Sequence, residues 1–177
     1  MNKKFWILII VVVGGLIGLF AIGQRGAGDQ EPQPQPRLGT KIEELGRDHI
    51  AVGQSHEPYN SNPPTSGPHY AQPADWGVSD QPLPDETLVH NLEHGGIIIS
   101  YRPDLPADQI EEIKNFYRDL PTSAFGNRKA VIVPRSANER PLSLTAWGYL
   151  LHLDAVDKNQ IRQFYLDHVD KGPEKVP

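Results

Sequence analysis

The chain has 177 residues, which is enough for one domain of ordinary size with a targeting segment and too few for two independent hydrophobic cores. Its 22 acidic side chains outnumber its 17 basic ones, and the resulting net charge of −5 argues against nucleic acid as a partner. The absence of cysteine excludes disulfides, thiolate metal ligands, a thiolate nucleophile and a lipidated N-terminal cysteine.

The N-terminal segment has the pattern of a transmembrane helix. Two lysines precede an apolar and glycine run without charge at residues 5–23, FWILIIVVVGGLIGLFAIG, which is about the length that crosses a bilayer. The positive-inside tendency places residues 1–4 in the cytoplasm. Small residues at Ala21 and Gly23 also fit a cleaved signal peptide. In both cases we expect the rest of the chain outside the cytoplasm, and a retained anchor predicts a single-pass protein of the cell membrane.

A linker and a long loop region are expected next. Residues 24–40 combine glycine with a PQPQP run, which is typical of a polyproline-like linker. The extracytoplasmic domain is predicted over residues 41–177. Proline and glycine interrupt residues 42–84 throughout, which predicts a long N-terminal loop region with at most a short strand at residues 49–53.

Regular structure is predicted after Pro84. The patterns indicate a helix at residues 85–94, a strand at 97–101, a helix from Pro106 to Pro121, strands at 129–133 and 144–153, and a last helix from Asp157 to Gly172. This order predicts a single compact α+β domain with helices against one face of a small sheet.

Five of the seven histidines lie between residues 49 and 94, which indicates a metal site. His90 and His94 are one helical turn apart and share a face. The turn at Gly67 and Pro68 can present His69 to that face. Three imidazoles resemble a zinc or copper(II) site, with His56 as a possible fourth ligand. We therefore predict a transition metal, copper or zinc, as the cofactor.

Two other interpretations remain open for the same residues. The HNLEH sequence satisfies the H-x-x-E-H pattern of zinc hydrolases, in which Glu93 would polarise water. The glycines that end the helix at once, and the lack of an evident third carboxylate ligand, disfavour an enzyme. We interpret Glu93 instead as a residue that orients a neighbouring imidazole. The second alternative is a metal-free protein-interaction module, for which the sequence names no partner.

The remaining histidines are assigned structural roles. His49 is expected at a strand edge, His152 in a strand and His168 on a helix surface.

Four stretches resemble a bacterial family known as domain of unknown function 3105. They are PPTSGPHY at residues 63–70, LVHNLEHGGIIISY at 88–101, TAWGYLL at 145–151 and KGPE at 171–174. The resemblance extends over residues 45–174 and implies an N-terminal membrane segment, a low-complexity linker and a domain outside the cytoplasm. It implies no activity. The positions characteristic of the family are Pro63, Pro64, Ser66, Gly67, Pro68, His69, His90, Glu93, His94, Gly95 and Tyr101.

Overall fold

The structure is a computed structural model that describes residues 36–177. The predicted membrane helix at residues 5–23, the four residues before it and most of the predicted linker lie outside the described residues. Within residues 36–177, none of the helices has the length and apolar character needed to span a bilayer. The membrane anchor and the predicted boundaries of the linker therefore stay predictions.

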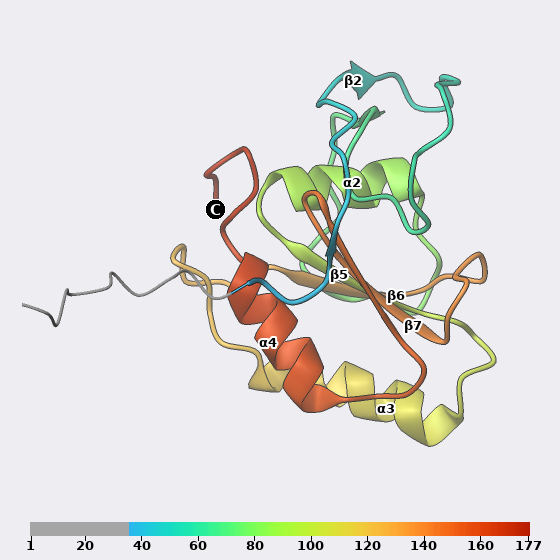
Figure 1. Cartoon of the computed structure of the whole chain (residues 1–177), viewed down its shortest axis with the longest axis vertical. Helices are drawn as coiled ribbons and strands as arrows, with labels where there is room; N and C mark the ends of the chain where they lie inside the picture. Colours follow the sequence, from blue (N-terminus) through green and yellow to red (C-terminus); the bar gives the residue numbers. More distant parts are fainter. Residues whose placement is uncertain (1–35) are drawn as a thin grey trace, which may run out of the picture. The chain divides into compact units, whose positions relative to one another are not determined.

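A mixed six-stranded sheet in the order β1-β8-β7-β5-β6-β4 forms the centre of residues 37–177, which are one compact unit (Figure 1). The central strand β5 (Ile97–Tyr101) is parallel to β6 (Ala130–Pro134) and antiparallel to β7 (Leu142–Ala146). The other strands of this sheet are β1 (Thr40–Lys41), β4 (Gly77–Val78) and β8 (Tyr149–Leu153). A separate pair consists of β2 (His49–Ile50) and β3 (His69–Tyr70). This arrangement confirms the predicted α+β fold.

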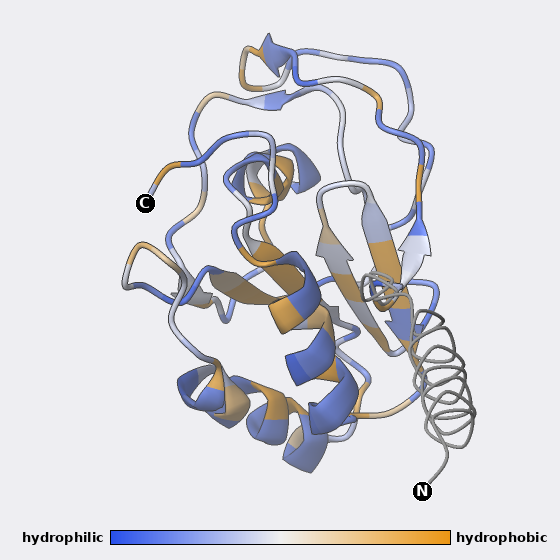
Figure 2. Ribbon diagram, turned by 60° about the vertical axis from the view of Figure 1, so that its left-hand side comes forward, coloured by the Kyte–Doolittle hydropathy of each residue, from blue (hydrophilic) through white to orange (hydrophobic). Residues whose placement is uncertain are grey.

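Helices cover both faces of the sheet, so the prediction that they pack on one face was wrong. The helices are α2 (Asp85–Glu93), α3 (Ala107–Phe116), a 3-10 turn η1 (Tyr117–Asp119) and α4 (Lys158–His168). The core with α3 and α4 contains Ile97 and Ile99 of β5, whereas the core with α2 contains Ile98. All five residues of β5 are buried, because a continuous apolar strand needs cover on both faces. In Figure 2 the longer strands of the six-stranded sheet are largely hydrophobic, and the helices are hydrophobic on one side and hydrophilic on the other.

The segment predicted as one strand at residues 144–153 is a hairpin. β7 and β8 pair antiparallel, with Ala146 opposite Tyr149, and leave a two-residue turn at Trp147 and Gly148. Gly148 has a φ of +69°, which suits the tight turns that join two antiparallel strands. The one-strand prediction was therefore wrong because it overlooked the glycine as a turn residue.

The other predicted elements are confirmed with shifts of a few residues at most. Pro84 and Pro106 directly precede α2 and α3. Asp157 caps α4, since its carboxylate accepts hydrogen bonds from the backbone of Asn159 and Gln160. The loop region (residues 42–84) contains only the two-residue strands β2, β3 and β4, as its proline and glycine content predicted.

The start of the described chain is fastened to the end of α4. The Leu38 backbone N–H donates to Asp167 at 2.8 Å, and the Leu38 carbonyl accepts from Nε2 of His168 at 2.8 Å. His168 is buried between the rings of Tyr149 and Phe164, with both ring centroids at 4.4 Å. The helix-surface role predicted for His168 is replaced by an internal one, because its side chain lies on the inner side of the last turn.

Because His168 joins the start of the described chain to α4, we predict that the protein loses stability in acid. Burial lowers the pKa of the His168 imidazole below its ordinary value of 6.5. The unfolded chain therefore binds the proton first, so the stability from this ring is complete above about pH 6.5 and decreases below that value. Urea unfolding of the full chain, followed by tryptophan fluorescence, gives the free energy of unfolding at each pH. We expect this free energy to fall more steeply between about pH 7 and 5 in the wild type than in His168→Gln, because glutamine keeps a donor but does not titrate. If the free energy of unfolding depends on pH in the same way in both proteins, the role assigned to His168 is incorrect.

Candidate functional site

The candidate site is built on the last turn of α2. Residues Leu88 to Glu93 of this helix are all buried, so even its polar side chains face the interior. The helix ends at Glu93, and Gly95, two residues later, has a φ of +76°, the left-handed conformation that favours glycine. A Cβ on Gly96 would lie 2.3 Å from the Trp76 ring, so a second small residue is needed there as well. The glycine pair thus stops the helix and lets the chain turn directly into β5.

Two further histidines come from the loop region. β2 and β3 pair in parallel, and the register places His49 directly beside His69. The His69 backbone N–H donates to the Asp48 carbonyl at 3.0 Å, which fixes this register. The ring centroids of the two histidines are 4.8 Å apart, and each lies 5.1 Å from the ring of His90. Residues separated by up to 41 positions in sequence therefore converge on one point.

Together these side chains form the histidine cluster, defined as His49, His69, His90 and Glu93. Each supplies one ligand atom, and these atoms all lie within 4.8 Å of one another. His69, His90 and Glu93 are buried, whereas the side chain of His49 is 49% exposed. The cluster is therefore enclosed by the protein on most sides and reachable from solvent beside His49. Its four nitrogen and oxygen donors can hold a metal ion.

Backbone carbonyls set the orientation of two of the rings. Nδ1 of His69 lies 2.8 Å from the Gly67 carbonyl oxygen, and Nδ1 of His90 lies 2.6 Å from that of Tyr70. A carbonyl can only accept, so both Nδ1 atoms carry the proton and the lone pair of a neutral ring is on Nε2. This tautomer follows from the hydrogen-bond network. In metal-binding histidines, the ring nitrogen that does not bind the metal usually donates its N–H to a carbonyl or a carboxylate in this way.

Glu93 lies on the Nε2 side of the rings. Its Oε2 is 3.0 Å from Nε2 of His69 and 3.6 Å from Nε2 of His49, and its side chain is 3% exposed. A carboxylate oxygen and a ring lone pair at 3.0 Å attract each other only with a proton or a cation between them. Glu93 thus contacts a neighbouring imidazole, as predicted, while the carbonyls of Gly67 and Tyr70 hold the Nδ1 side of two of the rings.

The other two predicted ligands lie at different distances from the cluster. Nε2 of His94 is 2.9 Å from Nε2 of His90, but His94 is not part of the group of four. Burial, followed by the proximity of His90, lowers the pKa of His94. His56 is not part of the group either, and its ring nitrogens contact the Glu57 carbonyl at 2.7 Å and the Glu86 carboxylate at 3.4 Å. The structure thus brings His69 and His90 together and adds His49, for which the sequence indicated only a strand edge.

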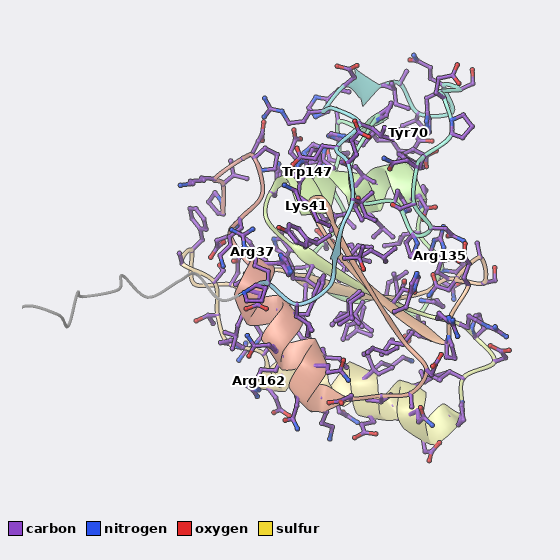
Figure 3. All side chains as sticks on the ribbon, in the orientation of Figure 1. Arg37, Lys41, Tyr70, Arg135, Trp147 and Arg162 are labelled. Carbon is purple, nitrogen blue, oxygen red and sulfur yellow. The ribbon has the colours of Figure 1, made fainter. Side chains whose placement is uncertain are left out.

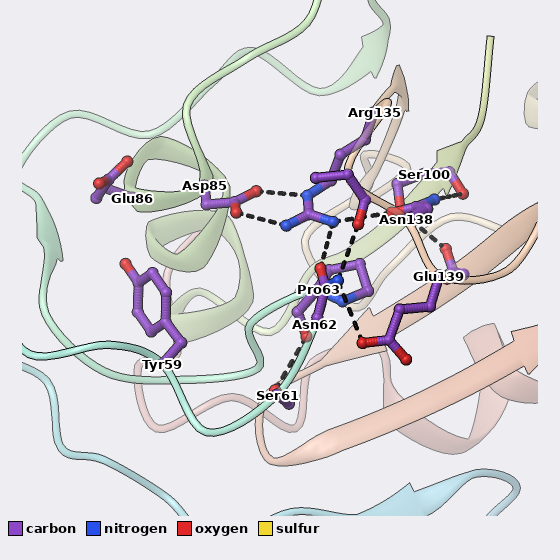
Figure 4. Close-up of polar contacts among 12 residues, drawn as sticks. Tyr59, Ser61, Asn62, Pro63, Asp85, Glu86, Ser100, Arg135, Asn138 and Glu139 are labelled. Carbon is purple, nitrogen blue, oxygen red and sulfur yellow. Dashed lines mark hydrogen bonds and ion pairs between the residues drawn. The ribbon is translucent and has the colours of Figure 1, made fainter.

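A salt bridge anchors the start of α2. Arg135 donates from Nε and Nη2 to the two carboxylate oxygens of Asp85 at 2.8 and 2.7 Å (Figure 4). Its Nη1 donates to the side-chain oxygens of Asn62 at 2.6 Å and Asn138 at 3.1 Å. The guanidinium therefore joins α2, the loop region and the loop after β6. Such a forked contact fixes direction as well as distance.

Side chains from α2, from the loop region itself and from the β7–β8 turn contact the loop region. Asn91 is fully buried and binds the backbone of Ala74 through both its oxygen and its nitrogen, each at 2.9 Å. The Tyr59 hydroxyl donates to the Pro68 carbonyl at 2.6 Å, one residue before His69. Trp147, labelled beside α2 in Figure 3, lies with its ring centroid 6.4 Å from that of His69. These contacts hold the histidine-bearing loop in place without regular secondary structure.

Two residues of the site were not identified as such from the sequence. The signal for His49 was its place at the start of the apolar HIAVG stretch, but only the pairing of β2 with β3 brings it to His69. Asn91 lies within the HNLEH pattern and carries no signal that separates it from a solvated helix residue.

A family model described as "Protein of unknown function (DUF3105)" matches residues 49–177. The match covers more than half of the chain and includes every residue of the histidine cluster, which confirms the resemblance seen in the sequence motifs. No curated protein and no solved structure matches the chain.

The close packing after α2 predicts that alanine at Gly95 destabilises the protein more than alanine at Gly53. Gly95→Ala would place Cβ 2.9 Å from the backbone of Asp170, whereas Gly53 has a similar φ of +79° and nothing within 4 Å. The left-handed conformation costs either alanine about 1–2 kcal/mol. Overlap should destabilise Gly95→Ala by about 1–3 kcal/mol more. Urea unfolding curves of the two variants test this difference, and equal losses would show that the end of α2 is not tightly packed.

Proposed function

We propose that this chain, which belongs to the DUF3105 family, binds one divalent transition metal ion, zinc or copper(II), through the histidine cluster. The ligands in this proposal are Nε2 of His49, His69 and His90 and the carboxylate of Glu93. The metal would be handled by the protein or would stabilise its fold.

The orientation of the rings carries this proposal. Two buried imidazoles have their Nδ1 protons engaged by backbone carbonyls, so their lone pairs are on Nε2, and Nε2 of His69 lies 3.0 Å from the buried carboxylate of Glu93. A buried cluster that only stabilised the fold would be expected to pair donors with acceptors. Here Nε2 of a neutral His69 and the Glu93 carboxylate are two acceptors that face one another, and a cation between them satisfies both.

The donor set favours zinc and copper(II). Imidazole nitrogens suit both ions, and a carboxylate adds the negative charge that lowers the cost of burying a divalent cation. The chain contains no cysteine and only one methionine, Met1, so a sulfur-rich copper(I) site is not available. The position of Glu93 within the cluster supports metal binding over the hydrolase alternative.

The cellular setting belongs to the same proposal and rests on the sequence. The apolar run at residues 5–23 would hold the chain in the cell membrane, and the histidine cluster would lie outside the cytoplasm. The cluster would then meet metal ions of the extracytoplasmic space.

Metal binding by the full chain is tested by elemental analysis and by titration with Zn²⁺ or Cu²⁺ against a competing chelator. We expect one equivalent of metal per chain. Because Glu93 is a ligand in the proposal, Glu93→Gln should weaken binding about 100-fold or more, and His69→Ala should do the same. A Co²⁺-substituted protein should show visible absorption bands of a low-symmetry site that are lost in both variants.

His56→Ala is the matched control, because it removes an imidazole from the loop region without removing a member of the cluster. It should bind one equivalent with unchanged affinity. If the wild-type chain takes up no metal, or if His56→Ala loses metal as readily as His69→Ala, the proposed site is incorrect.

A further inference from the structure

His94 stands between the histidine cluster and the C-terminal segment, defined as residues 170–176. Its Nε2 is 2.9 Å from Nε2 of His90 and 3.4 Å from Oε2 of Glu174. Because Nδ1 of His90 donates to the Tyr70 carbonyl, Nε2 of His90 is the acceptor in this contact and Nε2–H of His94 is the donor. One hydrogen atom of His94 thus has two acceptors within reach.

The lone pair of His90 cannot serve both His94 and a metal ion. A neutral imidazole has a single in-plane lone pair on its unprotonated nitrogen. In the proposed metal site this lone pair belongs to the metal, so the hydrogen bond from His94 must break when the metal binds. The nearest alternative acceptor for its N–H is the Glu174 carboxylate, which at 3.4 Å is the more distant of the two acceptors and is therefore less favourable until the metal takes the lone pair of His90.

Glu174 belongs to a segment that is packed against the end of α2 (Figure 1). Its backbone N–H donates to the Glu93 carbonyl at 3.0 Å, and the Asp170 N–H donates to the Gly95 carbonyl at 2.9 Å. The fully buried ammonium of Lys129 joins both sides, since it lies 3.0 Å from the His94 carbonyl oxygen and 3.0 Å from the Asp170 carboxylate. The C-terminal segment is therefore in direct contact with the helix turn that carries the cluster.

We propose that His94 and Glu174 couple metal occupancy of the histidine cluster to the C-terminal segment. This inference rests on the proposed metal site. Without metal, His94 donates to His90 and Glu174 has no strong donor from the helix. With metal at His90, His94 donates to Glu174 and holds the C-terminal segment more firmly against α2.

Hydrogen–deuterium exchange of the full chain with and without Zn²⁺ tests the coupling. One added charge-assisted hydrogen bond should slow amide exchange in residues 170–174 by about two- to ten-fold on saturation with Zn²⁺. In Glu174→Ala this local slowing should disappear while Zn²⁺ still binds. Glu111→Ala is the control, because it removes an exposed carboxylate from α3 and should respond as the wild type does.

Metal affinity of His94→Ala gives a second and independent reading. Because His94 competes with the metal for the lone pair of His90, its removal should strengthen Zn²⁺ binding by about two- to ten-fold. If His94 is itself a ligand, as the sequence predicted, the same variant should bind Zn²⁺ far more weakly.

The outcomes separate the coupling from the metal site itself. Zn²⁺ binding without slower exchange in residues 170–174, slowing that persists in Glu174→Ala, or weaker binding by His94→Ala would each overturn the coupling and leave the metal site standing. Failure of the wild-type chain to bind Zn²⁺ or Cu²⁺ would overturn both.

Discussion

The burial of α2 between the sheet and the loop region is the constraint on which the candidate site depends. A helix of nine residues has little stability of its own in water, so its position is set by its neighbours. Leu88 and Leu92 pack in the core with the sheet, while Asn91 binds the loop region. Since the helix is enclosed on both sides, His90 and Glu93 cannot turn to solvent and must find partners inside the protein. The histidine cluster is the arrangement that provides them.

The same constraint explains how a proline-rich region can be ordered. The loop region has few backbone hydrogen bonds in strands, and side chains replace them by binding its backbone. Tyr59 binds the Pro68 carbonyl, Nδ1 of His69 binds the Gly67 carbonyl, and Asn91 binds Ala74. Most of these contacts lie next to the cluster. The loop is thus held by side-chain contacts close to the histidine cluster, which fixes the geometry of the cluster.

The last turn of α2 faces two different surroundings. On one side Glu93 and His90 meet the rings of His49 and His69 from β2 and β3, and on the other His94 meets the C-terminal segment. Lys129 fastens this second side by binding the His94 carbonyl with a buried ammonium group. Gly95 allows the helix end and the C-terminal segment to approach closely, because any side chain at this position would overlap the backbone of Asp170. The HNLEHGG sequence therefore combines two members of the histidine cluster, a helix end and a contact surface for the C-terminal segment in seven residues.

The sequence by itself determined the local features of this protein. Apolar periodicity predicted α3, α4 and β5, prolines and glycines predicted the loop region, and the motifs around His69 and His90 predicted the family. These are properties of neighbouring residues. Tertiary structure alone decided which histidines meet: His49 reaches His69 through the parallel pairing of β2 and β3, and His56 lies elsewhere beside Glu86. It also decided that Glu93 faces the ring nitrogens, because ring orientation depends on carbonyl groups of residues 67 and 70 that only folding brings to fixed positions.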